Sequence, residues 1–312
     1  MKRRLLLRAV PGTAALGVLG ACGPQTYRGP TTSLRIAAGE RGGLFYAFAT
    51  LLAGQIAATE PKLRPTVVET DASQQNLRLL TTFSADLALT LLDSATGEPG
   101  RSWLRALGRT YEDYLQLLVS AGGRIQQLAD LAGARISLGA AGSGAAFTGQ
   151  RLLAVAGLEN HALDVRHYPI AQAAVALRTG SVDALLWSGG IPTPLLSALA
   201  RKFPVRMLDL QLVLADLQGK FPDLYDAAVA PPGVYGQQLA VRTVGVATLL
   251  TCRADLDPAI AAAVTNVLVT RSAQLVPPEV VGTQFLDTPT LLATGRIPLH
   301  PGAITAYRQL RH

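Results

Sequence analysis

The stretch over residues 135–158 constrains the fold of this chain more than any other. Ile136 and Leu138 alternate as in a strand, and residues 139–144 form a loop of Gly, Ala and Ser. An apolar helical face follows, and Gly157 is placed to end that helix. A loop of small residues lets the backbone approach a ligand, and the helix start behind it offers N–H groups with partial positive charge. This arrangement favours a site for a carboxylate or phosphate.

Ser143 has two roles open to it, because its hydroxyl can cap the helix or bind a ligand. An ordinary connection capped by serine is therefore the alternative to a binding loop. The loop lacks the Lys-Ser/Thr pair of a P-loop, and it fits neither G-x-G-x-x-G nor the G-x-S-x-G of hydrolases. The sequence thus predicts an anion cradle with no catalytic residue attached.

Three further loops share this character, at 39–43, 71–76 and 188–192. Each follows an expected strand and precedes an expected helix. Strands and helices alternate throughout the chain, which is typical of an α/β fold with mainly parallel sheets. Ligands bind such sheets at the carboxyl ends of the strands. We therefore expect the four loops to converge on one cleft.

The N-terminus indicates export. Residues 1–21 combine a basic start with a small apolar stretch that is too short to span a bilayer, as in a signal peptide. Residues 19–22 resemble the lipobox of bacterial lipoproteins, which implies lipidation of Cys22; a buried cysteine is the alternative. Residues 22–33 are predicted to form a flexible tether. We expect a periplasmic protein that is lipid-anchored to a bacterial membrane.

The totals exclude several classes of protein. A length of 312 residues allows two domains, and the formal charge of +7 falls to +3 once the leader with its basic residues is removed. A charge this small gives no reason to expect nucleic acid. The second cysteine, Cys252, follows an apolar run and is predicted to be a buried core residue. The histidines show no metal-ligand spacing with the cysteines, so we expect neither a metal nor a cofactor.

Motifs along about residues 34–310 resemble the TAXI-type solute receptors of tripartite ATP-independent periplasmic (TRAP) transporters. They occur in the family's order: Gly42-Gly43 with Tyr46; Ser73, Asn76 and Leu77; Asp86-Leu87-Ala88; Gly142-Ser143-Gly144; Asp183-Ala184 with Gly190 and Pro192; and Pro298-Leu299-His300-Pro301-Gly302-Ala303. The resemblance implies an α/β, two-lobed periplasmic-binding-protein fold (type II-like), with two mixed sheets flanked by helices and a ligand cleft between the lobes.

The resemblance also implies the division of the chain. Lobe one would comprise residues 31–119 plus 242–312, and lobe two residues 120–241. The strands at 115–120 and 241–251 would be the hinge crossings, and closure on a ligand would be a hinge motion. The closed form would dock onto the TRAP transporter membrane subunits, and we expect a monomer.

The chain departs from the family at positions near the implied cleft. Ala145 stands where a Thr is usual, Leu91 replaces a common Gln, and Phe45 replaces the first Tyr of a pair. Known members of the family are associated with amino acids such as glutamate and with dicarboxylates. The departures suggest a more apolar pocket, so the ligand is left open between a small organic acid and an amino acid.

Twelve candidate ligand-binding residues follow from the loops and the motifs. They are Gly42, Gly43, Tyr46, Ser73, Asn76, Gly142, Ser143, Gly144, Trp187, Gly190, Arg41 and Glu40. Ser73 and Asn76 have capping as their alternative, and Trp187 has core packing. Arg41 is expected to pair with a ligand carboxylate or to be a solvated loop residue. Glu40 is expected to accept a ligand ammonium, and His300 to have a structural role.

The sequence therefore predicts an extracytoplasmic solute-binding receptor with no enzymatic activity. Two alternatives stay open at this point. The same cleft would serve a ligand-sensing lipoprotein that signals to a membrane kinase. A serine-type hydrolase with Ser143 or Cys252 as nucleophile would need an activating base, and the sequence shows none beside them.

Overall fold

The computed structural model describes residues 26–159, 163–278 and 286–310. The expected signal peptide and Cys22 lie outside the described residues. Within the described part of the chain, no helix is both long and apolar enough to cross a membrane.

In the described part of the chain, ten strands form one sheet in the order β2-β1-β3-β10-β4-β7-β5-β6, with β8 beside β4 and β9 beside β10. Their bounds are β1 Thr32–Ala37, β2 Leu63–Val68, β3 Leu87–Leu91, β4 Leu104–Ser120, β5 Arg135–Ser137, β6 Asp164–Arg166, β7 Ala184–Gly189, β8 Val205–Met207, β9 Asp226–Ala230 and β10 Val241–Arg253. β1 pairs in parallel with β2 and β3, and β5 does so with β6 and β7. β4 and β10 run antiparallel to all their neighbours, so the pairing is mixed.

Helices cover the sheet on both faces. They are α1 Leu44–Thr59, α2 Ser73–Thr81, α3 Leu92–Gly97, α4 Gly144–Val155, α5 Ile170–Thr179, α6 Pro194–Ala200, α7 Gln211–Lys220, α8 Pro258–Thr270, α9 Thr288–Leu292 and α10 Pro301–Gln309. Short 3-10 turns occur at Arg101–Trp103, Leu128–Leu131, Val234–Gly236 and Ser272–Leu275.

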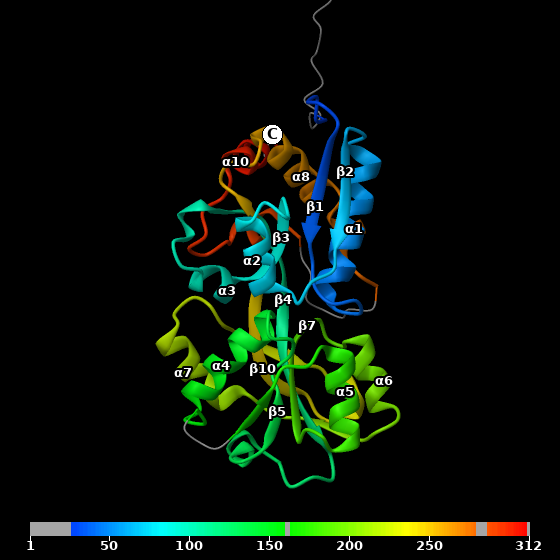
Figure 1. Cartoon of the computed structure of the whole chain (residues 1–312), viewed down its shortest axis with the longest axis vertical. Helices are drawn as coiled ribbons and strands as arrows, with labels where there is room; N and C mark the ends of the chain where they lie inside the picture. Colours follow the sequence, from blue (N-terminus) through cyan, green and yellow to red (C-terminus); the bar gives the residue numbers. More distant parts are fainter. Residues whose placement is uncertain (1–25, 160–162, 279–285, 311–312) are drawn as a thin grey trace, which may run out of the picture.

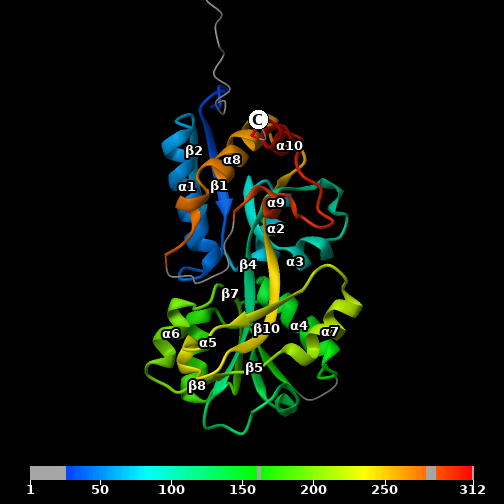
Figure 2. The same cartoon turned by 180° about the vertical axis from the view of Figure 1, so that it is seen from behind.

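The elements gather into two groups along the long axis of the molecule, as Figure 1 shows. The upper group holds β1–β3, α1–α3 and α8–α10, and the lower group holds β5–β9 and α4–α7. β4 and β10 run through both groups, side by side in both views (Figures 1 and 2). This is the α/β periplasmic-binding-protein fold of type II. The two expected sheets are joined into one, because β4 and β10 are long enough to pair in both groups.

Two local predictions need correction. The hinge strand expected at 115–120 already begins at Leu104, as part of β4. The tether prediction is wrong for its second half. Tyr27 is buried, its amide donates a hydrogen bond to Glu60 at 2.7 Å, and β1 already starts at Thr32. Burial of the Tyr27 side chain stabilises its position, because apolar surface is removed from water. A flexible tether would leave this side chain exposed.

Two predicted structural roles are confirmed. Cys252 lies on β10 with no exposed surface, and burial raises the pKa of its thiol to about 12. His300 is the N-cap of α10, where its Nδ1 accepts a hydrogen bond from the amide of Gly302 at 3.1 Å. Burial lowers the pKa of His300, which favours the neutral ring that such a cap requires.

Candidate functional site

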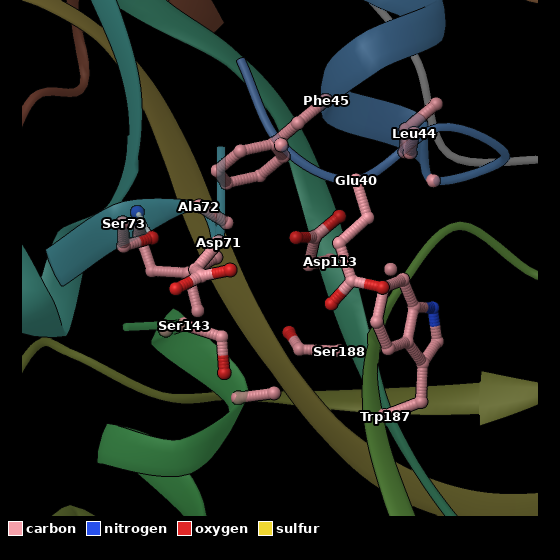
Figure 3. A pocket seen from close by; sticks show the side chains of 16 residues that line it. Glu40, Leu44, Phe45, Asp71, Ala72, Ser73, Asp113, Ser143, Trp187 and Ser188 are labelled. Atoms are coloured by element: carbon pink, nitrogen blue, oxygen red, sulfur yellow. Dashed lines mark hydrogen bonds between the residues drawn. The ribbon is translucent and has the colours of Figure 1, made fainter. Parts of the chain in front are cut away.

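A small cavity, here called the central cavity, lies where loops of the upper and lower groups meet (Figure 3). Its volume is about 30 Å³. Its lining is Gly39, Glu40, Gly43, Leu44, Phe45, Asp71, Ala72, Ser73, Leu91, Asp113, Ser143, Gly144, Ala145, Trp187, Ser188 and Gly189. Every one of the four predicted loops contributes to this lining, so their predicted convergence is confirmed.

The two serines of the predicted loops have structural roles as well as a place at the cavity. Ser143 caps α4, since its Oγ accepts a hydrogen bond from the amide of Ala146 at 3.0 Å. Ser73 opens α2, and its Oγ accepts from the amide of Leu91 at 3.0 Å. Each hydroxyl keeps its own hydrogen to donate. The predicted capping role is found at Ser143 and not at Ser73, and at both serines the structural bond is compatible with a ligand contact.

Asn76 does not line the central cavity. Its amide nitrogen donates to the carbonyl oxygens of Ala38 at 2.5 Å and Leu89 at 2.7 Å, and its Oδ1 accepts from Thr70 at 2.6 Å. The side chain has no exposed surface and joins α2 to the residue after β1 and to the middle of β3. Asn76 thus positions the start of α2, which explains the residue without a ligand contact.

Gly142 and Gly144 bring the two groups into contact. The carbonyl oxygen of Gly142 accepts a hydrogen bond from the amide of Gln75 at 3.0 Å, across the boundary between the groups. A Cβ at Gly144 would lie 2.6 Å from both Oγ of Ser73 and Cδ1 of Leu91. Glycine at position 144 therefore permits an approach that any side chain would block.

Glu40 links the loop after β1 to the lower group. Its Oε2 accepts a hydrogen bond from the amide of Ile170, the first residue of α5, at 2.7 Å. Burial raises the pKa of Glu40, and the nearby charges of Asp71 and Glu69 add to that effect. Trp187 is 7% exposed and lies against Gly43, so its ring both joins the core and walls the cavity.

A second cavity of about 210 Å³, the side cavity, receives other predicted residues. Gly42, Tyr46 and Gly190 line it, and Gly43 borders both cavities. Arg41 lines neither one. Its guanidinium pairs with Glu69 at 2.7 Å and lies 4.8 Å from the centre of the Tyr46 ring, with 70% of the side chain exposed. The solvated-loop interpretation of Arg41 agrees with this placement.

Three polar residues of the central cavity are not among the predicted site residues: Asp71 and Ser188, which lie in two of the predicted loops, and Asp113, which does not. Figure 3 shows the carboxyl groups of Asp71, Asp113 and Glu40 arranged around the same space. Asp113 lies on β4 and is 2% exposed; burial raises its pKa well above the ordinary value, and the charge of Glu112 adds to this. For Asp113, the available signal was the pair of acids at 112 and 113, directly before the mostly apolar stretch 114–119.

Comparison with known protein families identifies the family of the chain. Residues 36–309 match the NMT1-like family. The chain belongs to this family.

Solved structures similar to this NMT1-like protein share its fold. A protein of Xanthomonas citri bound to ATP aligns with a TM-score of 0.50 and 13% identity, over 90% of this chain and 98% of that one. A protein of Bordetella bronchiseptica RB50 aligns with a TM-score of 0.50 and 19% identity, over 89% of each chain. The alkanesulfonate-binding protein SsuA of Xanthomonas axonopodis pv. citri, bound to MOPS, aligns with a TM-score of 0.49 and 20% identity, over 90% of this chain and 85% of that one.

A buried polar network in the NMT1-like protein joins the two groups beside the cavity. Asp93 on α3 has no exposed surface and accepts hydrogen bonds from Thr148 on α4 at 2.7 Å and from Tyr225 at 2.9 Å. Burial raises the pKa of Asp93, whereas these bonds and Arg151 act in the opposite direction. The guanidinium of Arg151 lies 4.3 Å from the ring of Phe221 and 4.0 Å from the carboxylate. The groups are therefore held together by more than apolar contact.

The cavity offers little to a nucleophilic serine. Among its described lining residues there is no histidine or lysine, and no hydrogen bond joins a carboxyl group of Glu40, Asp71 or Asp113 to Ser143, whose Oγ accepts from the helix that it caps. Nucleophilic catalysis by serine requires such a base within hydrogen-bond reach. The geometry gives the hydrolase alternative no support.

Proposed function

We propose that this protein is an extracytoplasmic solute receptor that captures a small organic acid or amino acid between its two lobes and delivers it to TRAP transporter membrane subunits. One observation carries the proposal. The central cavity is lined from both groups, and contacts across the boundary close it on several sides: Gly142 with Gln75, Glu40 with Ile170, and Asp93 with Tyr225. A cavity built in this way opens when the groups part and closes around what it binds.

The chemistry of the cavity supports a polar ligand. The first turns of α2 and α4 begin at its wall, so backbone N–H groups and the positive ends of two helix dipoles face a bound carboxylate. The hydroxyls of Ser73 and Ser143 add donors. We take lobe one as residues 31–119 plus 242–312 and lobe two as 120–241, with β4 and β10 as the hinge crossings. No covalent step is part of the proposal.

The variant Gly144→Ala tests capture by closure. The new Cβ would lie 2.6 Å from atoms of the opposite group, whereas alanine at the start of α4 suits the helix itself. We expect the variant to fold but to bind weakly, because its groups cannot close. The mature wild-type domain is melted with a panel of amino acids, oxo acids and dicarboxylates. A solute that binds should raise the melting temperature, because at 100 times its Kd it adds about 2.7 kcal/mol to the free energy of unfolding.

Gly54→Ala is the matched control, because position 54 lies in α1 with open space around its Cβ. The control should keep the ligand-induced shift, and Gly144→Ala should lose it while still melting cooperatively. A shift that is equal in both variants would show that the solute binds elsewhere.

Delivery and anchoring need a separate test. Cells that express the chain together with a candidate TRAP permease should take up the solute, and uptake should fail with Gly144→Ala. Cys22→Ala should release the protein from the membrane fraction if the lipobox is used. Uptake that is independent of the receptor would contradict delivery but would leave solute binding intact.

A further inference from the structure

Polar atoms without partners gather in the central cavity. Among the described residues, Oδ1 of Asp113, Oε1 of Glu40 and Oγ of Ser188 are buried and have no hydrogen-bond partner, and all three residues line this cavity. Nε1 of Trp187, another lining residue, also has no partner, but Figure 3 shows it on the side of the ring that faces away from these oxygen atoms. Buried polar atoms are nearly always paired in folded proteins. Three such atoms around one cavity therefore point to a ligand that pairs them.

The titratable side chains that line the cavity are all acidic. Three of its described lining residues are acids, Glu40, Asp71 and Asp113, and none is a lysine, arginine or histidine. Arg41, the predicted partner for a ligand carboxylate, pairs with Glu69 outside the lining. A second or third carboxylate on the ligand would be repelled here, whereas a cation would be attracted.

Asp113 is the central member of this set. It comes from β4, which crosses between the groups, and it is 2% exposed. Figure 3 shows its carboxyl group beside that of Glu40, above Ser188 and the ring of Trp187. An ionised carboxylate buried without a counter-charge is costly, so an ionised Asp113 requires a cation from the solute.

We propose that Asp113 selects solutes that carry a protonated amino group, with Glu40 and Ser188 as the further acceptors. An ammonium group has three N–H donors and no acceptor, which matches three converging oxygen acceptors. The proposal rests on the proposed function and narrows it: amino acids or other amines bind, and oxo acids and dicarboxylates of the same size do not.

Matched solute pairs test the selection. Calorimetric titration of the mature domain compares each amino acid with the oxo acid of the same skeleton, such as valine with 3-methyl-2-oxobutanoate and alanine with pyruvate, and includes simple diamines. The wild type should prefer the amino form by on the order of 30-fold or more, as expected for a buried charge pair. Asp113→Asn should reduce this preference to a few-fold by weakening the amino form, with the oxo form unchanged.

Glu112→Gln is the control for the general electrostatic field. Glu112 neighbours Asp113 on β4, pairs with Arg109 at 3.7 Å and does not line the central cavity. The variant removes one negative charge but keeps the contact between Asp113 and the ammonium group, so the preference for the amino form should persist. A loss of preference that is equal in both variants would overturn the role of Asp113.

Failure of this inference is distinguishable from failure of the proposed function. If the wild type binds an oxo acid or a dicarboxylate as tightly as the amino form, and Gly144→Ala abolishes that binding, the receptor stands and the selection by Asp113 is overturned. If no member of any pair binds, both proposals fail. These comparisons require that Asp113→Asn is folded. We expect it to melt cooperatively, because asparagine removes the cost of burying a carboxylate.

Discussion

Tyr225 donates a hydrogen bond to the buried carboxylate of Asp93 at 2.9 Å, although 132 positions separate the two residues in the sequence. Asp93 belongs to the upper group and Tyr225 precedes β9 in the lower group. The bond therefore exists only while the groups are together. It gives the closed arrangement a polar contact that depends on the position of both groups.

Tyr225→Phe should lower the free energy of unfolding by about 1–2 kcal/mol and shift the molecule toward an open form, because Asp93 loses one donor. Urea unfolding measures the first effect, and the radius of gyration from small-angle scattering measures the second. Tyr307→Phe is the control, since the Tyr307 hydroxyl donates to Leu107 at 2.7 Å within the upper group. The control should lose stability without a change in radius. An unchanged radius in Tyr225→Phe would contradict a role in closure.

Glu40→Ala should expose the first amide groups of α5 to exchange. The carboxylate accepts from Ile170 across the cleft, as a helix cap would, so its loss should speed hydrogen exchange at Ile170 by about 2- to 30-fold. Asp257→Ala offers the comparison, because Asp257 caps α8 from its own group through Ala259 at 2.7 Å. It should speed exchange in α8 alone. Unaltered exchange at Ile170 would show that the contact does not hold the groups together.

Asp113→Asn should change how stability depends on pH. Burial raises the pKa of Asp113, so above about pH 4 the unfolded chain has lost a proton that the native state keeps. The free energy of unfolding of the wild type therefore falls as pH rises from 4 toward the native pKa. Asparagine removes this loss, so the variant should melt at or below the wild-type temperature at pH 4 and above it at pH 7.

Asp130→Asn gives the opposite trend and serves as the comparison for this pH series. The amides of Gln126 and Gln127 donate to Asp130 and lower its pKa, so its contribution to stability is present above its unfolded pKa and disappears on acidification. The carboxyl groups of Glu40, Asp71 and Glu112 lie around or beside Asp113 and are present in all three proteins. A parallel pH profile for wild type and Asp113→Asn would mean that Asp113 has an ordinary pKa.

Ala72→Gly should stabilise the protein by about 1 kcal/mol. Ala72 precedes α2 at the cavity wall with φ 79° and ψ −144°, a conformation that costs an L-residue on the order of 1–3 kcal/mol and glycine much less. Ala57→Gly, at an exposed position in α1, should instead lose up to about 1 kcal/mol. Urea unfolding of the two variants gives the comparison. A destabilised Ala72→Gly would show that the local conformation is not strained.

Short-range patterns were sufficient for much of the fold and for part of the site. The alternation of strands and helices, the loops that precede α2 and α4, and the caps at Ser143 and His300 all depend on neighbours within a few positions. The convergence of the four loops also followed, because parallel strands place their carboxyl ends at one edge of a sheet.

The sequence by itself thus determined the order of elements, the α/β class and the small-residue loops, since these depend on local periodicity and turn chemistry. Only the tertiary structure decided how their side chains are used. Asn76 bonds backbone from two strands, and Arg41 turns to Glu69 instead of the cavity. Asp113 lies in the first half of β4, where the polar residues hide the strand pattern. β10 nevertheless pairs along that half, and the carboxylate is buried at the cavity. Burial and charge pairing arise from residues far apart in the chain, so no local pattern contains them.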